Sequence, residues 1–184
     1  MRPIEPGDKA AILAIYEGLS EQSRYQRFMT AVAEPSESDL RYLTEVDHTD
    51  HEALLAIDAG SGAATGVGRF VRAGADSAEA AIAVVDHWQG RGLGTVLCQL
   101  LAERAREVGV RRFEALLLAT NVQMLDVLAA LGPAKVISRD AATIQVEVEI
   151  PDVGIGEHMA GVLRVAAGGT VEIATPPLGL RTGG

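Results

Sequence analysis

The stretch that decides the fold is AEAAIAVVDHWQGRGLGTV, residues 78–96. Residues 80–85 form a short apolar run, which is too short for a helix and is typical of a buried strand. Glycines at positions 90, 92 and 94 follow. From Leu93 to Leu101 the apolar residues then recur at helical spacing. The sequence therefore predicts a strand, a glycine-rich turn and a helix.

The glycine turn leads into the start of a helix, and this arrangement predicts an anion site. The first N–H groups of a helix have no partner within it and lie at the positive end of the helix dipole. Glycines lack a Cβ atom and so let a phosphate approach the main chain. The spacing matches neither the dinucleotide pattern G-x-G-x-x-G nor the Gly-Lys-Ser/Thr of a mononucleotide loop. A phosphate of another class of ligand is expected here.

Around this unit the patterns predict helices first and then a mixture of strands and helices. Helices are expected at 8–19 (with Asp8 as N-cap), 20–29, 36–46, 93–109 and 121–131, and strands at 2–4, 53–58, 66–72, 80–85, 113–118, 135–138 and 143–150. A right-handed crossover makes the strand at 113–118 parallel to the central strand. Residues 151–184 are expected to form a C-terminal extension, with a short helix at 157–165.

Composition excludes several classes of protein. The chain has 184 residues and a net charge of −9, which argues against a nucleic-acid binder and against adsorption to an anionic membrane. An acidic surface favours a basic acceptor. The single cysteine, Cys98, and an N-terminus without an apolar signal segment favour the cytoplasm, and no apolar run reaches membrane length. The histidines lack the spacing of metal ligands, so no metal is expected.

Gln89, Gly92 and Gly94 match the pattern Q/R-x-x-G-x-G/A, so the turn resembles the acyl-CoA motif of the GNAT superfamily of N-acetyltransferases. The stretch from Asn121 to Leu131-Gly132 follows the strand at 113–118, and in that family a cofactor-binding asparagine begins the helix at this place. The order of elements over residues 1–150 is also that of the family. With Ser-Arg-Tyr-x-Arg-Phe at 23–28, the chain most resembles the catalytic domain of bacterial protein lysine acetyltransferases.

The resemblance implies an α/β (α+β) GNAT fold for residues 1–150. Its mixed central sheet has about six to seven strands, helices on both faces and a splayed central pair of parallel strands. It also implies that acetyl-CoA is the cosubstrate, with its pantetheine arm in the splay. The implied cofactor contacts are Ile82, Ala83, Val84, Gln89, Gly90, Arg91, Gly92, Leu93, Gly94, Thr95 and Asn121. Arg91 either reaches a phosphate or stays in solvent.

The same resemblance assigns the chemistry. Glu79, at the start of the central strand, is expected to be the general base, acting through water, and the N–H of Val84 the oxyanion donor. The alternative for Glu79 is a solvated carboxylate at a strand edge. The helix with Arg24, Arg27 and Phe28 is expected to wall the acceptor site, where these side chains contact acceptor or pantetheine or pack in the core.

One position departs from the family. Many GNAT enzymes have a tyrosine seven residues after the asparagine, which protonates the leaving thiolate, and this chain has Leu128 there. Tyr25 either substitutes for it or packs, and Cys98 is expected to be a buried thiol with no role in transfer. His48, His51 and His87 are expected in solvent or loops, and Trp88 is expected to pack under the glycine turn.

The sequence thus predicts an acetyl-CoA-dependent N-acetyltransferase in which a primary amine attacks the thioester directly in a ternary complex. The acceptor is a protein lysine or, alternatively, a small-molecule amine. A third hypothesis, from a different class, is a non-catalytic acyl-CoA-binding sensor module, motivated by Leu128 and the added C-terminal residues. Dimers are common in the family, so the resemblance also allows a homodimer.

Overall fold

The structure is a computed structural model that describes residues 1–29 and 34–152. The helix expected at 157–165 and most of the C-terminal extension lie outside the described residues. Within them the elements are η1 (Pro6–Asp8), η2 (Asp86–Trp88), α1 (Lys9–Glu17), α2 (Glu21–Phe28), α3 (Glu37–Thr44), α4 (Leu93–Glu107), α5 (Val122–Ala129), β1 (Arg2–Pro3), β2 (His51–Ile57), β3 (Ala64–Arg72), β4 (Ser77–Val84), β5 (Arg112–Leu118), β6 (Ala134–Asp140) and β7 (Thr143–Glu149).

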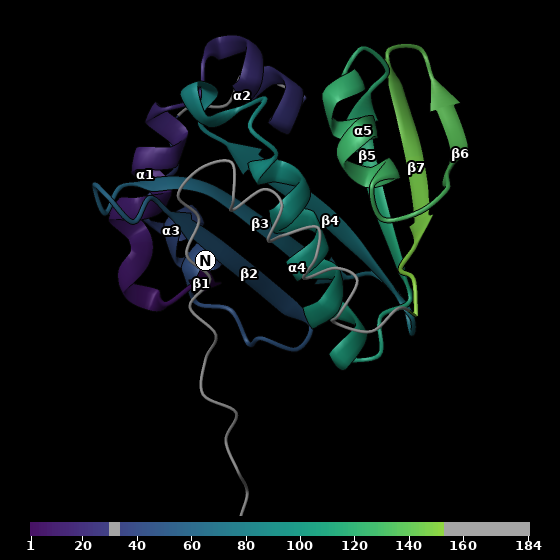
Figure 1. Cartoon of the computed structure of the whole chain (residues 1–184), viewed down its shortest axis with the longest axis horizontal. Coiled ribbons are helices and arrows are strands. Elements are labelled where there is room, and N and C mark those ends of the chain that lie inside the picture. Colours follow the sequence, from purple (N-terminus) through teal and green to yellow (C-terminus); the bar gives the residue numbers. More distant parts are fainter. Residues whose placement is uncertain (30–33, 153–184) are drawn as a thin grey trace, which may run out of the picture.

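The strands form one seven-stranded sheet in the order β1-β2-β3-β4-β5-β7-β6, as Figure 1 shows. The pair β4 and β5 is parallel, and the other neighbours are antiparallel. Helices α4 and α5 pack on one face of the sheet, and α1 and α3 pack on the other. This mixed sheet with helices on both faces confirms the predicted fold class.

The central parallel pair is joined only at its beginning. The register of β4 against β5 runs from Ser77–Arg112 to Glu79–Glu114 and then stops. Beyond Glu79, β4 stays paired with β3 on its other side as far as Val84. Figure 1 shows the two strands diverging from this point. The splay expected from the resemblance is therefore present, and it leaves one edge of β4 unpaired over residues 80–84.

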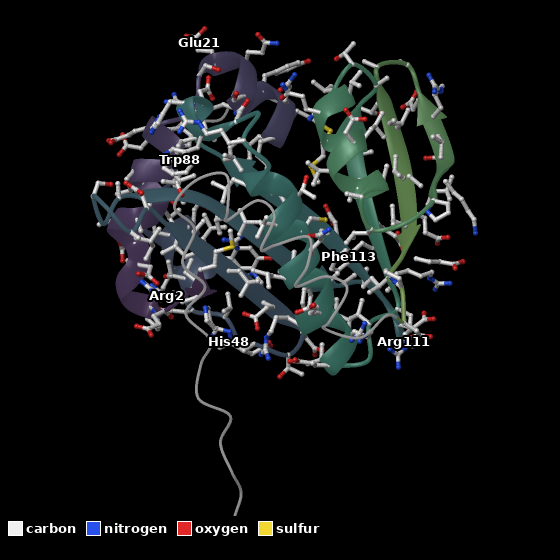
Figure 2. All side chains as sticks on the ribbon, in the orientation of Figure 1. Arg2, Glu21, His48, Trp88, Arg111 and Phe113 are labelled. Atoms are coloured by element: carbon white, nitrogen blue, oxygen red, sulfur yellow. The ribbon has the colours of Figure 1, made fainter. Side chains whose placement is uncertain are left out.

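Two apolar layers hold the sheet between its helices. The layer under α4 and α5 contains Phe70 and Phe113, whose ring centroids are 6.1 Å apart, and Phe113 is labelled in Figure 2. The layer under α1 and α3 is smaller and contains Ile4, Leu55 and Val85. Because both layers consist of side chains that are almost completely buried, the sheet is a rigid support for the splay.

Two local predictions need correction. Asp8 does not cap α1 with its side chain, because its carboxylate accepts bonds from Arg2 (2.6 and 2.7 Å) and from the Glu5 N–H. His51 is the first residue of β2 and contacts the Arg69 guanidinium (3.1 Å), so it does not lie in a loop. His48 lies in a loop as expected, where it bonds the buried Glu52 (2.7 Å). Ser36, by contrast, caps α3 through its side chain and forms a capping box with Asp39.

Candidate active site

The splay between β4 and β5 opens into a groove with a volume of about 330 Å³. Residues 80–84 of β4 form its floor, α2 forms one wall and α5 the other, and the glycine turn forms its mouth. The lining is mostly apolar, with a few polar groups, as in a ligand site of ordinary size. One groove therefore brings together the central strand, the glycine turn and the helix that follows Asn121.

The main chain of β4 offers hydrogen bonds to an occupant of this groove. Val85 N–H donates to Thr65 O on β3 (3.0 Å). Because successive N–H groups along a strand point in opposite directions, the N–H groups of Ile82 and Val84 point toward the groove. That of Ala83 points toward β3, so Ala83 lines the groove without offering its N–H.

The glycine turn has the geometry that an anion site needs. Gly90 and Gly92 have φ angles of 70° and 82°, a region that favours glycine. Gly92 caps α4 without a side-chain bond, and Val96 N–H is the first to bond back, to Gly92 O. The N–H groups of residues 93–95 therefore have no partner within the helix. They lie at the mouth of the groove, at the positive end of the α4 dipole.

Gln89 is tied to the protein itself. Its amide nitrogen donates to Val84 O (2.9 Å) and lies 3.2 Å from Asp86 Oδ1 and 3.3 Å from Ser23 Oγ. Burial alone would raise the pKa of Asp86, but hydrogen bonds from Ser20 and Ser23 and the charge of Arg24 hold that pKa below its usual value. The side chains of Gln89 and Asp86 thus join the end of β4 to α2.

The other residues of the mouth have separate roles. Arg91 lies over the ring of Trp88, 5.1 Å from its centroid, and is not part of the groove lining. Trp88, labelled in Figure 2, lines the groove and packs against both apolar layers. Asn121 lines the groove while its Oδ1 accepts from Met124 N–H (3.1 Å), so it also caps α5.

Glu79 lies where the pairing of β4 with β5 ends, directly before Ala80, and it is not part of the groove lining. Its side chain is exposed, as expected from the alternative of a solvated carboxylate at a strand edge. The register places Glu114 beside it on β5 and Glu147 beside Glu114 on β7, so three carboxylates cross one face of the sheet in a row. The row lies next to the groove, and one of its members, Glu147, forms an ion pair with Arg112 (3.8 Å).

Two residues singled out from the sequence lie outside the groove lining. Leu128 is 1% exposed and packs in the core, so the position where the family often has tyrosine does not face the groove. Cys98 is also fully buried, and burial raises the pKa of its thiol to about 12. Tyr25 is exposed on α2 and does not line the groove either.

The sequence missed most of the two walls. From α2 the groove receives Ser23, Gln26 and Arg27, and from α5 it receives Gln123 and Asp126. Arg27 had been placed on the acceptor-wall helix, but nothing in the sequence separated the groove face of either helix from its solvent face. Asp86 was missed as well, although its position directly before the turn was a usable signal.

Comparison with known proteins identifies the family. A sequence model described as an acetyltransferase (GNAT) domain matches residues 1–133. The chain belongs to the GNAT acetyltransferase family. It is 37% identical over 155 residues to acetyltransferase Pat of Mycolicibacterium smegmatis, a match that covers 83% of this chain and 46% of that protein. The chain thus spans about half the length of this relative.

Two solved structures of GNAT proteins are similar to this chain. The GNAT domain of S. lividans PAT has a TM-score of 0.74 and 32% identity, covering 80% of this chain and 88% of that one. A GNAT phosphinothricin acetyltransferase from Sinorhizobium meliloti in complex with AcCoA has a TM-score of 0.67 and 18% identity, covering 82% and 88%. The second likeness is one of fold. Among the described residues of this chain, no helix is long and apolar enough to cross a membrane.

Proposed function

We propose that this GNAT protein is an acetyl-CoA-dependent N-acetyltransferase that acts on a primary amine by direct attack in a ternary complex. One observation carries the proposal: a single groove runs from unpaired amides at the start of α4, along the free edge of β4, to Ala80, the residue that follows Glu79. A pyrophosphate, a pantetheine arm and a thioester need these features in this order. The relative from S. meliloti, solved with AcCoA, supports the choice of cosubstrate.

In this proposal the amides of residues 90–95 hold the pyrophosphate, and the free N–H groups of β4 hold the pantetheine and the thioester oxygen. Val84 lies five residues from Glu79 and Ile82 three, or about 16 and 10 Å along a strand. Ile82 is therefore the nearer of the two oxyanion donors. With either donor, a bound water has to carry the proton from the amine to Glu79.

Calorimetric titration with acetyl-CoA and with free CoA tests the cofactor site. Micromolar binding, about −8 kcal/mol, is expected for both. A Cβ atom at Gly94 meets Val127 Cγ2 at 3.4 Å and Val84 Cγ2 at 3.9 Å, so Gly94→Phe extends into the groove and should abolish binding. Gly60→Phe, in an open turn between β2 and β3, is the matched control and should bind normally. Equal affinities in the two variants would contradict the proposed site.

Glu79→Gln tests the general base. Loss of a positioned base typically costs about 10²- to 10⁴-fold in rate, so kcat should fall by at least 10²-fold with acetyl-CoA affinity unchanged. Glu114→Gln is the control, because Glu114 is the directly adjacent carboxylate on the next strand. A larger loss of kcat in Glu114→Gln than in Glu79→Gln would place the base on β5 and contradict the proposal.

We propose a protein lysine as the first acceptor class to test, as the sequence resemblance implies. The net charge of −9 and the acidic row of Glu79, Glu114 and Glu147 support a basic acceptor. Mass spectrometry of a proteome and of a panel of small amines, each incubated with the protein and acetyl-CoA, separates lysine modification from small-molecule acetylation.

A non-catalytic acyl-CoA sensor is the second candidate. The observation that favours it is the lining of the groove, which within the described residues contains no Tyr, His, Lys or Cys to give a proton to the leaving sulfur. The two candidates differ in turnover. Acetyl transfer to any amine, abolished by Glu79→Gln, would exclude the sensor, whereas tight acetyl-CoA binding without transfer to any amine would favour it.

A further inference from the structure

Arg27 has an unusual place in the groove. Among the described side chains that line it, only Arg27 and Asp126 carry a charge, so Arg27 is the one cation in this lining. It lies in the last turn of α2, on the wall that faces the start of the unpaired edge of β4. Any negative charge that develops in the groove therefore has a single cationic side chain in its lining.

The guanidinium of Arg27 has no protein partner that satisfies it. Within residues 1–29 and 34–152 the side chain is half-buried and makes no hydrogen bond or ion pair, and its recorded contact is with the ring of Phe28, 5.1 Å away. A guanidinium has five N–H donors, and withdrawing them from water without a partner is unfavourable. An unpaired, partly desolvated arginine in a ligand groove is thus suited to an anionic group of the ligand.

Charged groups on the neighbouring strands act on the Arg27 guanidinium. Burial lowers the pKa of Arg27, and the carboxylate of Glu79 on β4 partly opposes that effect. Arg69, behind it on β3, has a pKa lowered to about 10 by burial and then by the charge of Arg27. Glu114 on β5 and Asp126 on α5 complete the charged groups that face this region. Arg27 thus lies in the groove wall formed by α2, which packs against β4, the strand that carries the proposed base.

We propose that Arg27 is a catalytic residue that contacts the sulfur of CoA and stabilises the thiolate as it leaves. This inference rests on the proposed transferase function. The amine nitrogen forms a bond to the acetyl carbon, the C–S bond breaks, and its electron pair goes to sulfur. The amine proton passes through water to Glu79, so no proton has to reach the sulfur. A charge-assisted bond from a partly desolvated guanidinium replaces the acid that the groove lacks.

The test is the titration of the thiol of free CoA bound to the protein, followed by the ultraviolet absorbance of the thiolate. An opposite charge within contact distance lowers a pKa by about 1–3 units. We therefore expect bound CoA to titrate at least about one pH unit lower in the wild-type protein than in Arg27→Met. Arg27→Lys, which keeps the charge, should retain part of the shift. Arg24→Met is the matched control, because Arg24 lies on the same helix, donates to Tyr16 O and does not line the groove.

Binding of desulfo-CoA, which lacks the thiol, distinguishes a contact of Arg27 with the sulfur from a merely structural role of Arg27. The affinity of desulfo-CoA should be the same in wild type and Arg27→Met at every pH, whereas the affinity of CoA relative to desulfo-CoA should rise with pH only in the wild type. If both ligands bind and the thiol titrates at the same pH in both proteins, the role of Arg27 is overturned and the proposed function stands. If CoA does not bind the wild-type protein, the proposed function itself fails.

Discussion

Replacement of Gln89 tests whether its side chain stabilises the site through hydrogen bonds within the protein or contacts the cofactor. The family resemblance assigns Gln89 to the cofactor, but in the structure its amide nitrogen already faces Val84 O, Asp86 Oδ1 and Ser23 Oγ. Two of these three atoms can only accept, so the network fixes which end of the amide points inward. We therefore predict that Gln89→Leu acts first on stability.

The magnitude follows from these contacts. A hydrogen bond contributes about 0.5–1.5 kcal/mol net, and a buried acceptor left without a partner costs about 1–3 kcal/mol. Val84 is only 9% exposed, so its carbonyl is the main loss, whereas Asp86 and Ser23 can turn to water. Gln89→Leu should lower the free energy of unfolding by about 2 kcal/mol, or Tm by about 4–8 °C.

Gln89→Glu has nearly the same shape and should cost more at neutral pH. It places an oxygen acceptor against Val84 O and a second negative charge beside the Asp86 carboxylate. Both raise the pKa of the introduced carboxyl group in the folded state. The stability deficit should therefore shrink as pH falls through that raised pKa, because protonation restores a donor.

Urea unfolding measures these differences, and Trp88, the only tryptophan, reports on the site directly. Calorimetry with acetyl-CoA is run on the same preparations. If Gln89 has a structural role, Gln89→Leu should lower the urea midpoint of unfolding and leave the dependence of the unfolding free energy on urea unchanged. Its affinity for acetyl-CoA should then be weaker but not absent. Unchanged stability together with complete loss of acetyl-CoA binding would refute the reasoning and return Gln89 to the role of a cofactor contact.

Three further predictions concern the core around the site. Leu128→Tyr should lower stability by about 1–3 kcal/mol without raising kcat, because the side chain is 1% exposed and does not face the groove; a gain in kcat would show otherwise. Cys98 should react with thiol reagents about 10³-fold more slowly in the folded than in the urea-unfolded protein at pH 8, since its pKa is raised from 9.0 to about 12. Arg104→Met should cost about 2–3 kcal/mol by leaving the buried Glu52 with one fewer partner, and Glu52→Leu in the same chain should restore most of that loss in urea unfolding.

Much of the fold was predictable because it depends on short-range patterns. The apolar run at 80–85, the glycines after it and the helical spacing from Leu93 predicted β4, the turn and α4, and the structure confirms all three. The right-handed crossover rule gave the parallel orientation of β5. The divergence of β4 and β5 was predicted only from the family resemblance, because no single residue of either strand indicates where their pairing stops.

The candidate site was predictable in its main chain more than in its side chains. Unpaired amides at the start of α4 follow from helix geometry alone, whatever packs around them. The direction of each N–H along β4 needed the register with β3, which sets Ile82 and Val84 apart from Ala83. Glu79 was placed correctly near the start of β4, but its exposure became known only from the packed structure.

The sequence by itself thus determined the order of the elements, the glycine turn and the unpaired amides that follow it, because each depends on residues close together in the chain. Only the tertiary structure decided which side chains complete the groove. Arg27 lines the same groove as Ala80, which lies more than fifty positions away, and Gln89 bonds Ser23 across 66 positions. Leu128 packs in the core, outside the groove lining. These contacts form only when the helices pack on the two faces of the sheet. Contacts between segments that are far apart in the chain produce no periodic pattern in the sequence, so they could not be predicted from it.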